Sequence, residues 1–291
     1  MSPVEVTFLN GIAGADFPAG LRKQAALGLT LLDIKDSLWG QRIEEIDEPT
    51  ATRVAALVAS ENLRVDCLST SIGCVSFRDG MTEAAFRATY DPLLANTLRT
   101  TGILRPRMVR LLLPAHLPRA AGESAFAAMH RTAPWVVDVY REWITRLAEI
   151  GVVPVLENEA HGCLFATPAD IAAFFHALDH PAARYIWDVQ NLWQMGVFPS
   201  LDAYAQLKPF IASLHLKGGR ADTPGGPLIH AAALEDASWP VREIVHAVLA
   251  DARVPVLCLN PSHGAKPADW DIWATAVRDL AYLRREFPQL Q

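Results

Sequence analysis

Four polar residues that can bind a metal ion stand at the ends of four apolar segments in the second half of the chain. Glu157 ends the segment VVPVLE, Asp188 ends RYIWD, His215 lies in IASLHL and Asn260 follows VPVLCL. Two carboxylates, an imidazole and an amide together suit one divalent cation, with Mn, Mg, Zn and Co all acceptable. We therefore predict a metal site, provided that the fold brings these four segment ends together.

Eight apolar segments of strand length recur along the chain, and helical patterns separate them. They lie at 4–9, 29–34, 64–69, 108–113, 152–157, 184–188, 211–216 and 254–259. Several are apolar nearly throughout, as expected of parallel strands that are covered on both faces. Alternating strands and helices imply right-handed crossovers, and eight such units in 291 residues favour one α/β domain, a single (β/α)8 barrel over residues 1–291.

Three helices have clear boundaries in the sequence. Thr167-Pro168 resembles a capping sequence ahead of an apolar stripe, a second stripe runs from Pro134 to the stop signal Gly151, and a third helix is predicted at 270–286. The segments near 75–100 and 114–132 are predicted to be loops with short helices over the barrel mouth. Active sites of such barrels lie at the carboxyl ends of the strands, so the four ligand candidates would share one rim.

The composition excludes several classes of protein. The chain is 51% hydrophobic and 20% charged, as in globular enzymes, and its net charge of −6 disfavours nucleic acid as a partner. No apolar run approaches the roughly 20 residues that span a bilayer, and the amino-terminal residues do not resemble a signal peptide. We expect a cytoplasmic protein with no membrane partner. The four cysteines lack the spacing of a zinc site or the density of a disulfide scaffold.

The segments VLENEAHG, WDVQNLWQMG and SLHLKGG resemble the xylose isomerase-like barrels, in particular the sugar phosphate isomerase/epimerase family. The resemblance implies that one divalent ion is bound by a Glu after strand five, an Asp after strand six, a His after strand seven and a Glu after strand eight. Glu157, Asp188 and His215 match the first three positions. The resemblance also implies that Asn191 and Lys217 face a small carbohydrate-like substrate, and that the protein forms a homodimer.

In that family the ion stabilises an enediolate that forms when a carboxylate takes a proton from carbon. Glu157 is the candidate for this carboxylate. The usual fourth glutamate is replaced here by Asn260, which can ligate a cation but cannot act as a base. The prediction therefore moves from a two-base epimerase toward a one-base isomerase or a lyase. His263 is a second candidate for proton transfer, because the ordinary pKa of histidine is near neutral.

Other polar residues near the predicted rim have weaker assignments. Glu159 is a candidate to orient the metal ligands or contact the substrate, and Arg220 is a candidate clamp for a phosphate or carboxylate. Arg110 lies inside the fourth segment, either as an anchor for a substrate anion or as a buried partner of the strand-end acids.

Two other functions remain to be distinguished from a metal-dependent isomerase or lyase. A non-catalytic sugar-binding descendant would have kept the pocket and lost the fourth carboxylate. An apurinic-site endonuclease has a related fold, but it needs several additional His ligands, and only His161, His215 and His263 lie near strand ends in this sequence.

Overall fold

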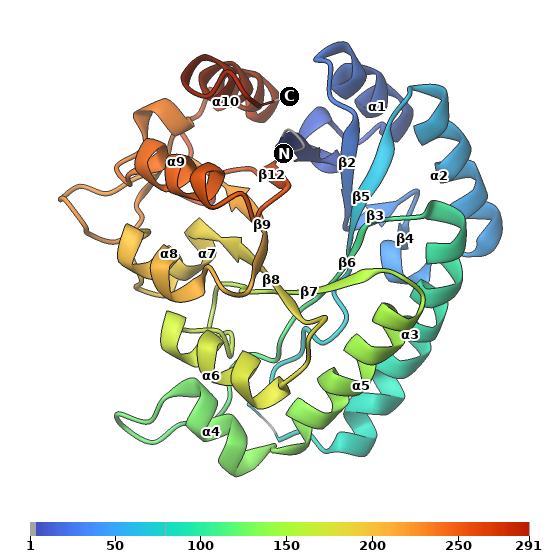
Figure 1. Ribbon diagram of the computed structural model, residues 1–291, viewed down its shortest axis with the longest axis vertical. Helices are drawn as coiled ribbons and strands as arrows, with labels where there is room; N and C mark the ends of the chain where they lie inside the picture. Colours follow the sequence, from blue (N-terminus) through green and yellow to red (C-terminus); the bar gives the residue numbers. More distant parts are fainter. Residues whose placement is uncertain (1–3, 79, 291) are drawn as a thin grey trace.

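A computed structural model describes residues 4–78 and 80–290, and eight parallel strands in it form a closed barrel (Figure 1). The barrel strands are β1 Glu5–Leu9, β2 Leu31–Lys35, β5 Arg64–Ser69, β6 Met108–Leu111, β7 Val153–Glu157, β8 Arg184–Asp188, β9 Ile211–Leu216 and β12 Val256–Leu259. Each strand pairs with its neighbour along the chain, and β12 pairs in parallel with β1, where Glu5 lies opposite Val256. The predicted (β/α)8 barrel is confirmed.

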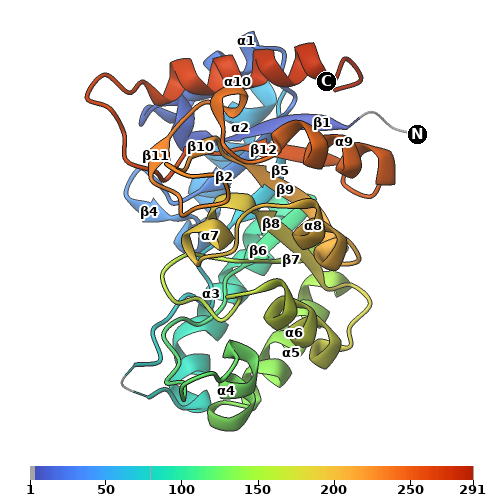
Figure 2. The same ribbon diagram turned by 90° about the vertical axis from the view of Figure 1, so that its left-hand side faces the viewer.

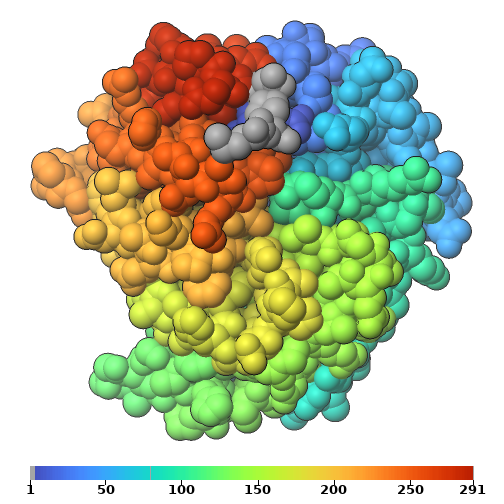
Figure 3. Space-filling view, viewed as in Figure 1, coloured from blue at the N-terminus to red at the C-terminus, as the bar shows by residue number. Residues whose placement is uncertain are grey.

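Helices surround this barrel on its outer side (Figure 1). They are α1 Phe17–Ala26, α2 Glu48–Ser60, α3 Glu83–Leu104, α4 Ala125–Thr132, α5 Trp135–Glu149, α6 Pro168–Leu178, α7 Val189–Gln194, α8 Leu201–Leu207, α9 Val241–Asp251 and α10 Ile272–Glu286. Three short 3-10 helices are η1 Asn10–Ala13, η2 Ile43–Glu45 and η3 Leu234–Asp236. The first and last parts of the chain lie side by side in the space-filling view (Figure 3), where the Arg284 guanidinium donates to the carbonyl of Leu27 at 2.9 Å.

Two small hairpins extend from the loops that follow β2 and β9. The first joins β3 Ser37–Leu38 to β4 Gln41–Arg42, and the second joins β10 Gly219–Arg220 to β11 His230–Ala231. Both lie at the end of the barrel where the strands finish (Figure 2). Among the described residues, no helix is long and apolar enough to cross a membrane.

The helix boundaries follow from local chemistry. Thr167 caps α6, because its hydroxyl accepts the amide N–H of Asp170 at 3.1 Å and Pro168 occupies the first turn without needing a partner for its nitrogen. Helix α5 buries Tyr140 and Trp143 against the barrel, as its apolar stripe predicts. These two helices and α10 therefore begin and end close to their predicted positions.

The segment near 75–100 was predicted to be mainly loop, and this prediction is wrong. From Glu83 the chain forms α3, a helix of 22 residues that starts at the Thr82 cap. Its Thr- and Ala-rich sequence gives only a weak apolar stripe, and Pro92 lies within it, so the sequence pattern does not predict a helix here. Packing against α2 and α5 stabilises the helix instead. In the segment 114–132 the predicted short helix is present as α4.

The barrel interior places an apolar layer directly beneath the polar strand ends. Met108, Val155 and Ile186 pack together inside the barrel with Cys67 and Ala212. Side chains two positions apart on a strand point to the same side. The residues two positions further along β6, β7 and β8 are Arg110, Glu157 and Asp188, so these buried charged side chains form the next layer above the apolar one.

Buried Asp279 makes the stability of this fold depend on pH. The carboxylate on α10 accepts the N–H of Leu234 at 2.7 Å, and burial raises its pKa from 3.8 to about 7 despite this bond. A raised folded-state pKa stabilises the fold at low pH, and this stabilisation is lost as pH rises toward 7. We expect this group to lower the unfolding free energy by up to about 4 kcal/mol between pH 4 and 7.

An Asp279→Asn variant should lack that part of the pH dependence, because the amide keeps an oxygen for Leu234 and carries no charge. Urea unfolding from pH 4 to 8 measures the difference between the two proteins, and Asp269→Asn at an exposed position is the control. Parallel pH profiles for wild type and Asp279→Asn would contradict the assignment.

Candidate functional site

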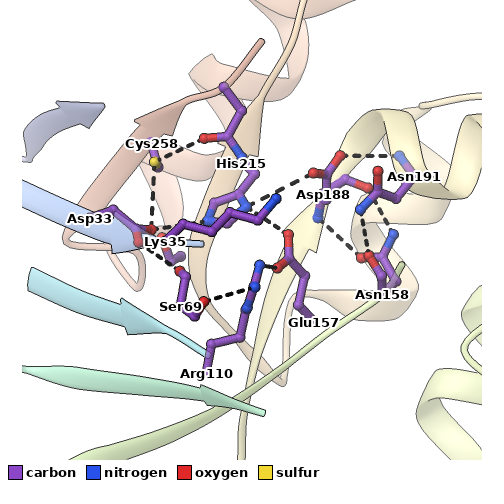
Figure 4. Close-up of polar contacts among 12 residues, drawn as sticks. Asp33, Lys35, Ser69, Arg110, Glu157, Asn158, Asp188, Asn191, His215 and Cys258 are labelled. Carbon is purple, nitrogen blue, oxygen red and sulfur yellow. Dashed lines mark hydrogen bonds and ion pairs between the residues drawn. The ribbon is translucent and has the colours of Figure 1, made fainter. Parts of the chain in front are cut away.

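Three of the four predicted ligands meet at the carboxyl ends of β7, β8 and β9. Glu157, Asp188 and His215 are buried, and each offers one ligand atom within 4.8 Å of the other two. His215 Nδ1 lies 2.7 Å from Glu157 Oε1 and 3.9 Å from Asp188 Oδ2. The three donors therefore face one another as the strand-end pattern predicts (Figure 4).

Asp188 is held by the start of α7. Its Oδ1 accepts the backbone N–H groups of Gln190 at 3.0 Å and Asn191 at 3.1 Å, so it is the N-cap of that helix. Its Oδ2 has no aligned hydrogen bond among the described residues, although the Lys217 ammonium lies 2.5 Å away. The cap fixes the carboxylate and leaves one oxygen directed at the cluster.

Glu157 lies between two cationic partners (Figure 4). Arg110 donates from Nη1 to Oε2, and its other N–H groups are bound by the carbonyls of Ser69 and Thr70 at 3.0–3.2 Å. Burial alone would raise the pKa of Glu157, but the charges of His215 and Arg110 outweigh it and hold the pKa well below its usual range. Glu157 is therefore a permanent anion, which suits a ligand better than a base.

Of the two roles predicted for Arg110, its contacts match that of a buried partner of the strand-end acids. Both its charge and its donors are used by the protein, and the side chain is only 3% exposed.

His215 is oriented by acids on both sides of its ring. Glu157 lies at Nδ1, and Asp33 on β2 lies 3.7 Å from Nε2, an atom without a hydrogen-bond partner among the described residues. Burial lowers the pKa of His215, but the carboxylates of Glu157, Asp33 and Asp188 raise it above its ordinary value. The ring is thus held between the Glu157 and Asp33 carboxylates.

Asp33 is a site residue that the sequence reasoning missed. Its Oδ1 accepts the Ser69 hydroxyl at 2.6 Å, and burial raises its pKa to about 6, while His215 and Ser69 oppose the rise. An acid in the middle of the apolar segment LLDIK is itself a signal, because a buried carboxylate needs partners.

Asn158 was also missed. It joins β7 to β8 by donating to the Asp188 carbonyl at 3.0 Å and accepting the Asp188 N–H at 3.1 Å.

The residues of the cluster fit a divalent cation. Two carboxylates and an imidazole are suitable donors, and His215 Nδ1 lies 2.7 Å from Glu157 Oε1 and 3.9 Å from the buried Asp188 Oδ2. The ligand atoms would be Glu157 Oε1, Asp188 Oδ2 and His215 Nδ1, with His215 Nε2 left to Asp33 as an orienting partner.

Asn260 lies on the wall of the adjacent cavity, where its Oδ1 accepts the Cys258 thiol at 3.1 Å. The backbone N–H of Asn260 continues the barrel pairing by donating to the Leu216 carbonyl at 3.0 Å. The end of β12 therefore places the amide at the rim, and the hydrogen bond from Cys258 orients it.

A cavity of about 300 Å³ opens above the cluster, within the size range of small-molecule sites. Glu157, Asp188, Asn191, Lys217 and Glu159 all line it, as predicted for site residues. Arg220 does not line it. This side chain is exposed on the β10–β11 hairpin, where Arg220 pairs with His230, so the structure does not place the predicted clamp at the cavity.

Lys217 is bound by protein groups at the edge of this cavity. Its ammonium lies 2.5 Å from Asp188 Oδ2, 2.6 Å from His263 Nε2 and 3.4 Å from Asn191 Oδ1. Asn191 in turn donates its amide N–H to the Asn158 carbonyl at 2.8 Å. Both side chains therefore stiffen the site, with few donors left for a substrate.

His263 does not have the near-neutral pKa that was expected of it. Partial desolvation of the ring by its neighbours and the charge of Lys217 lower its pKa to about 4, and the ring accepts a hydrogen bond from the Lys217 ammonium. At neutral pH His263 is therefore uncharged, with one nitrogen already used.

Glu159 is the free carboxylate of the cavity. The side chain is half-buried and makes no hydrogen bond or ion pair with any described residue. Burial and the nearby charge of Glu157 raise its pKa above the ordinary glutamate value. The surroundings of Glu159 thus raise its pKa, whereas those of Glu157, two residues earlier, lower it.

Comparison with known proteins supports the fold. No protein-family model matches the sequence, and no curated protein is detectably similar to it. Among solved structures, a xylose isomerase-like TIM barrel protein from Mycobacterium smegmatis in complex with magnesium has a TM-score of 0.70 and 17% identity, covering 98% of this chain and 96% of that one. The probable 3-DHS dehydratase AsbF from Bacillus anthracis has a TM-score of 0.69 and 13% identity over 96% and 98%.

The D-allulose 3-epimerase from Methylomonas sp., solved with D-allulose, has a TM-score of 0.69 and 15% identity over 99% and 98%. The chain therefore has the xylose isomerase-like TIM barrel fold.

Proposed function

We propose that the protein is a divalent-metal-dependent isomerase that acts on a small carbohydrate or polyol-derived carbonyl compound. The observation that carries the proposal is the convergence of Glu157, Asp188 and His215 beside a cavity lined by Glu159, whose carboxylate makes no hydrogen bond or ion pair with a described residue. A bound divalent cation would polarise the substrate carbonyl and stabilise an enediolate. The neighbours with epimerase and dehydratase names, and the one with magnesium, support this reaction class.

The protein groups divide into ligands and a proton carrier. Glu157 and Asp188 supply two negative charges to the cation, and Asp33 and Arg110 keep the ligands in place. Glu159 takes a proton from the hydroxyl-bearing carbon next to the carbonyl and returns it to the former carbonyl carbon, while the proton of that hydroxyl group passes to the former carbonyl oxygen. We assign proton transfer to Glu159 in place of Glu157, because only Glu159 is unpaired and has a raised pKa.

The amide of Asn260 at the predicted fourth position favours isomerisation over epimerisation. Epimerisation through an enediolate needs a proton donor on each face of the substrate, and Asn260 cannot provide one. His263 is occupied by Lys217. The second candidate is a lyase that removes water after the same proton abstraction, which one base can begin and which the dehydratase neighbour supports.

Deuterium exchange across a panel of sugars tests the proposal. We expect that aldoses, ketoses and their phosphates incubated in D₂O with the protein and Mn, Mg, Zn or Co will include one that exchanges the hydrogen beside its carbonyl. Proton NMR follows this exchange and any new isomer. Formation of an unsaturated product would support the lyase, and ligand binding without any exchange or turnover would support the non-catalytic alternative.

A further inference from the structure

A second hollow of about 180 Å³ adjoins the main cavity on the side of β2. The two share the wall residues Asn10, Gly11, Lys35 and Asp36, so they lie side by side. The far end of the hollow is formed by Phe17 and Trp39. An apolar cavity of roughly 150 Å³ can hold benzene, so this space is large enough for a six-membered ring.

Trp39 stands at a position where folding alone disfavours a tryptophan. It occupies the first place of the two-residue turn between β3 and β4, where Leu38 pairs with Gln41. Trp39 has a φ of 49° and Gly40 a φ of 86°, which defines a type I′ turn. Such turns favour Asn-Gly, and a bulky residue at positive φ is a rare outlier.

The indole is nevertheless exposed and held in a fixed orientation. It is 44% exposed, while the edge of the Phe17 ring meets it with centroids 5.8 Å apart and an interplanar angle of 84°. The Arg53 guanidinium lies 4.0 Å from its ring centroid. A strained backbone that presents a rigid, partly exposed aromatic ring beside a cavity is typical of a binding position.

The junction between the two cavities is polar and carries both charges. The Asp36 side chain is 78% exposed, and its carboxylate lies 3.9 Å from the Lys35 ammonium. This distance is too long for a hydrogen bond, so both groups can still bind a ligand. The side-chain oxygen of Asn10 accepts the backbone N–H of Lys35 at 2.8 Å, so the NH₂ group of Asn10 is not used by this bond and can donate to a ligand. Hydroxyl groups can donate to Asp36 and accept from Lys35 and Asn10, whereas an apolar ligand would leave these groups unpaired.

We infer that this hollow is a second subsite for a sugar ring, and that the substrate is a glycoside whose reacting sugar fills the main cavity. The second ring lies against Trp39, and its hydroxyl groups contact the Asn10, Lys35 and Asp36 side chains. The identity of the reacting end rests on the proposed function, while the subsite itself rests on the Trp39 turn and the shared cavity walls.

Saturation-transfer NMR and titration with cellobiose, maltose and glucose test the subsite. At least one disaccharide should bind the wild-type protein about tenfold more tightly than glucose. Trp39→Ala should remove that advantage and Trp39→Phe should keep part of it. Leu201→Ala, at an exposed apolar position on α8, should match wild type. Thermal unfolding checks that each variant is folded.

Equal affinity for disaccharide and monosaccharide in the wild-type protein, or equal losses for both sugars in Trp39→Ala, would overturn the subsite. Metal binding and deuterium exchange on the same samples keep the two proposals apart. If disaccharide affinity depends on Trp39 but no metal binds, the subsite is supported and the proposed reaction is excluded. If metal binds and exchange occurs but disaccharide affinity does not depend on Trp39, the reaction is supported and the subsite is excluded.

Discussion

An Arg110→Met variant is expected to lose about 3–5 kcal/mol of unfolding free energy in metal-free buffer at pH 7. Arg110 and Glu157 are 3% and 2% exposed at their side chains, so removal of the guanidinium leaves a buried carboxylate without one of its two cationic partners. Urea unfolding in the presence of a chelator measures the loss. The loss should shrink as pH falls, because protonation of Glu157 then removes the stranded charge.

Two further variants separate this effect from lost packing. Arg110→Met combined with Glu157→Gln should recover much of the stability, since no charge is then left unpaired. Arg64→Met breaks the 3.4 Å pair with Glu5, in which the Arg64 side chain is 70% exposed, and should unfold at nearly the urea concentration of wild type. If the double variant were as unstable as the single one, the charge argument would be wrong.

A Glu159→Gln variant is expected to lose about 10²- to 10⁴-fold in deuterium exchange or turnover, the usual contribution of a positioned general base. It should still bind the divalent cation, because Glu159 is not one of the three converging ligands. In the wild-type enzyme the rate should fall with decreasing pH as Glu159 becomes protonated. The fall should begin above the ordinary glutamate range, since burial and Glu157 raise the pKa of Glu159.

Kinetics of wild type, Glu159→Gln and Glu149→Gln, at an exposed control position on α5, measure this effect. Undiminished deuterium exchange in Glu159→Gln would show that another residue is the base.

The sequence predicts the barrel because parallel strands covered on both faces are apolar throughout, and this signal is local. It also predicts that Glu157, Asp188 and His215 converge, since strand ends share a rim whatever the exact packing. Helix α3 escaped prediction, because packing against α2 and α5 stabilises a helix whose own apolar pattern is weak.

The electrostatics of the site could not be predicted from the sequence. The pairs Arg110–Glu157 and Lys217–His263 join residues 47 and 46 positions apart, and they depend on which side chains the barrel brings into contact. These contacts lower the pKa values of Glu157 and His263, and they leave Glu159 as the free carboxylate. The position of Arg220 was wrong for a similar reason, because the β10–β11 hairpin pairs it with His230 outside the cavity.

Titration of chelator-treated protein with Mn²⁺, followed by calorimetry and elemental analysis, tests the central claim most directly. Asp188→Asn is the decisive variant, because the amide can still cap α7 through its oxygen while the ligand charge is lost. His230→Ala removes an exposed histidine that pairs with Asp222 and serves as the control. The predicted result is one ion per chain in wild type and His230→Ala, and greatly weakened binding in Asp188→Asn. Absence of stoichiometric binding, or equal binding by all three proteins, would contradict a metal centre formed by Glu157, Asp188 and His215.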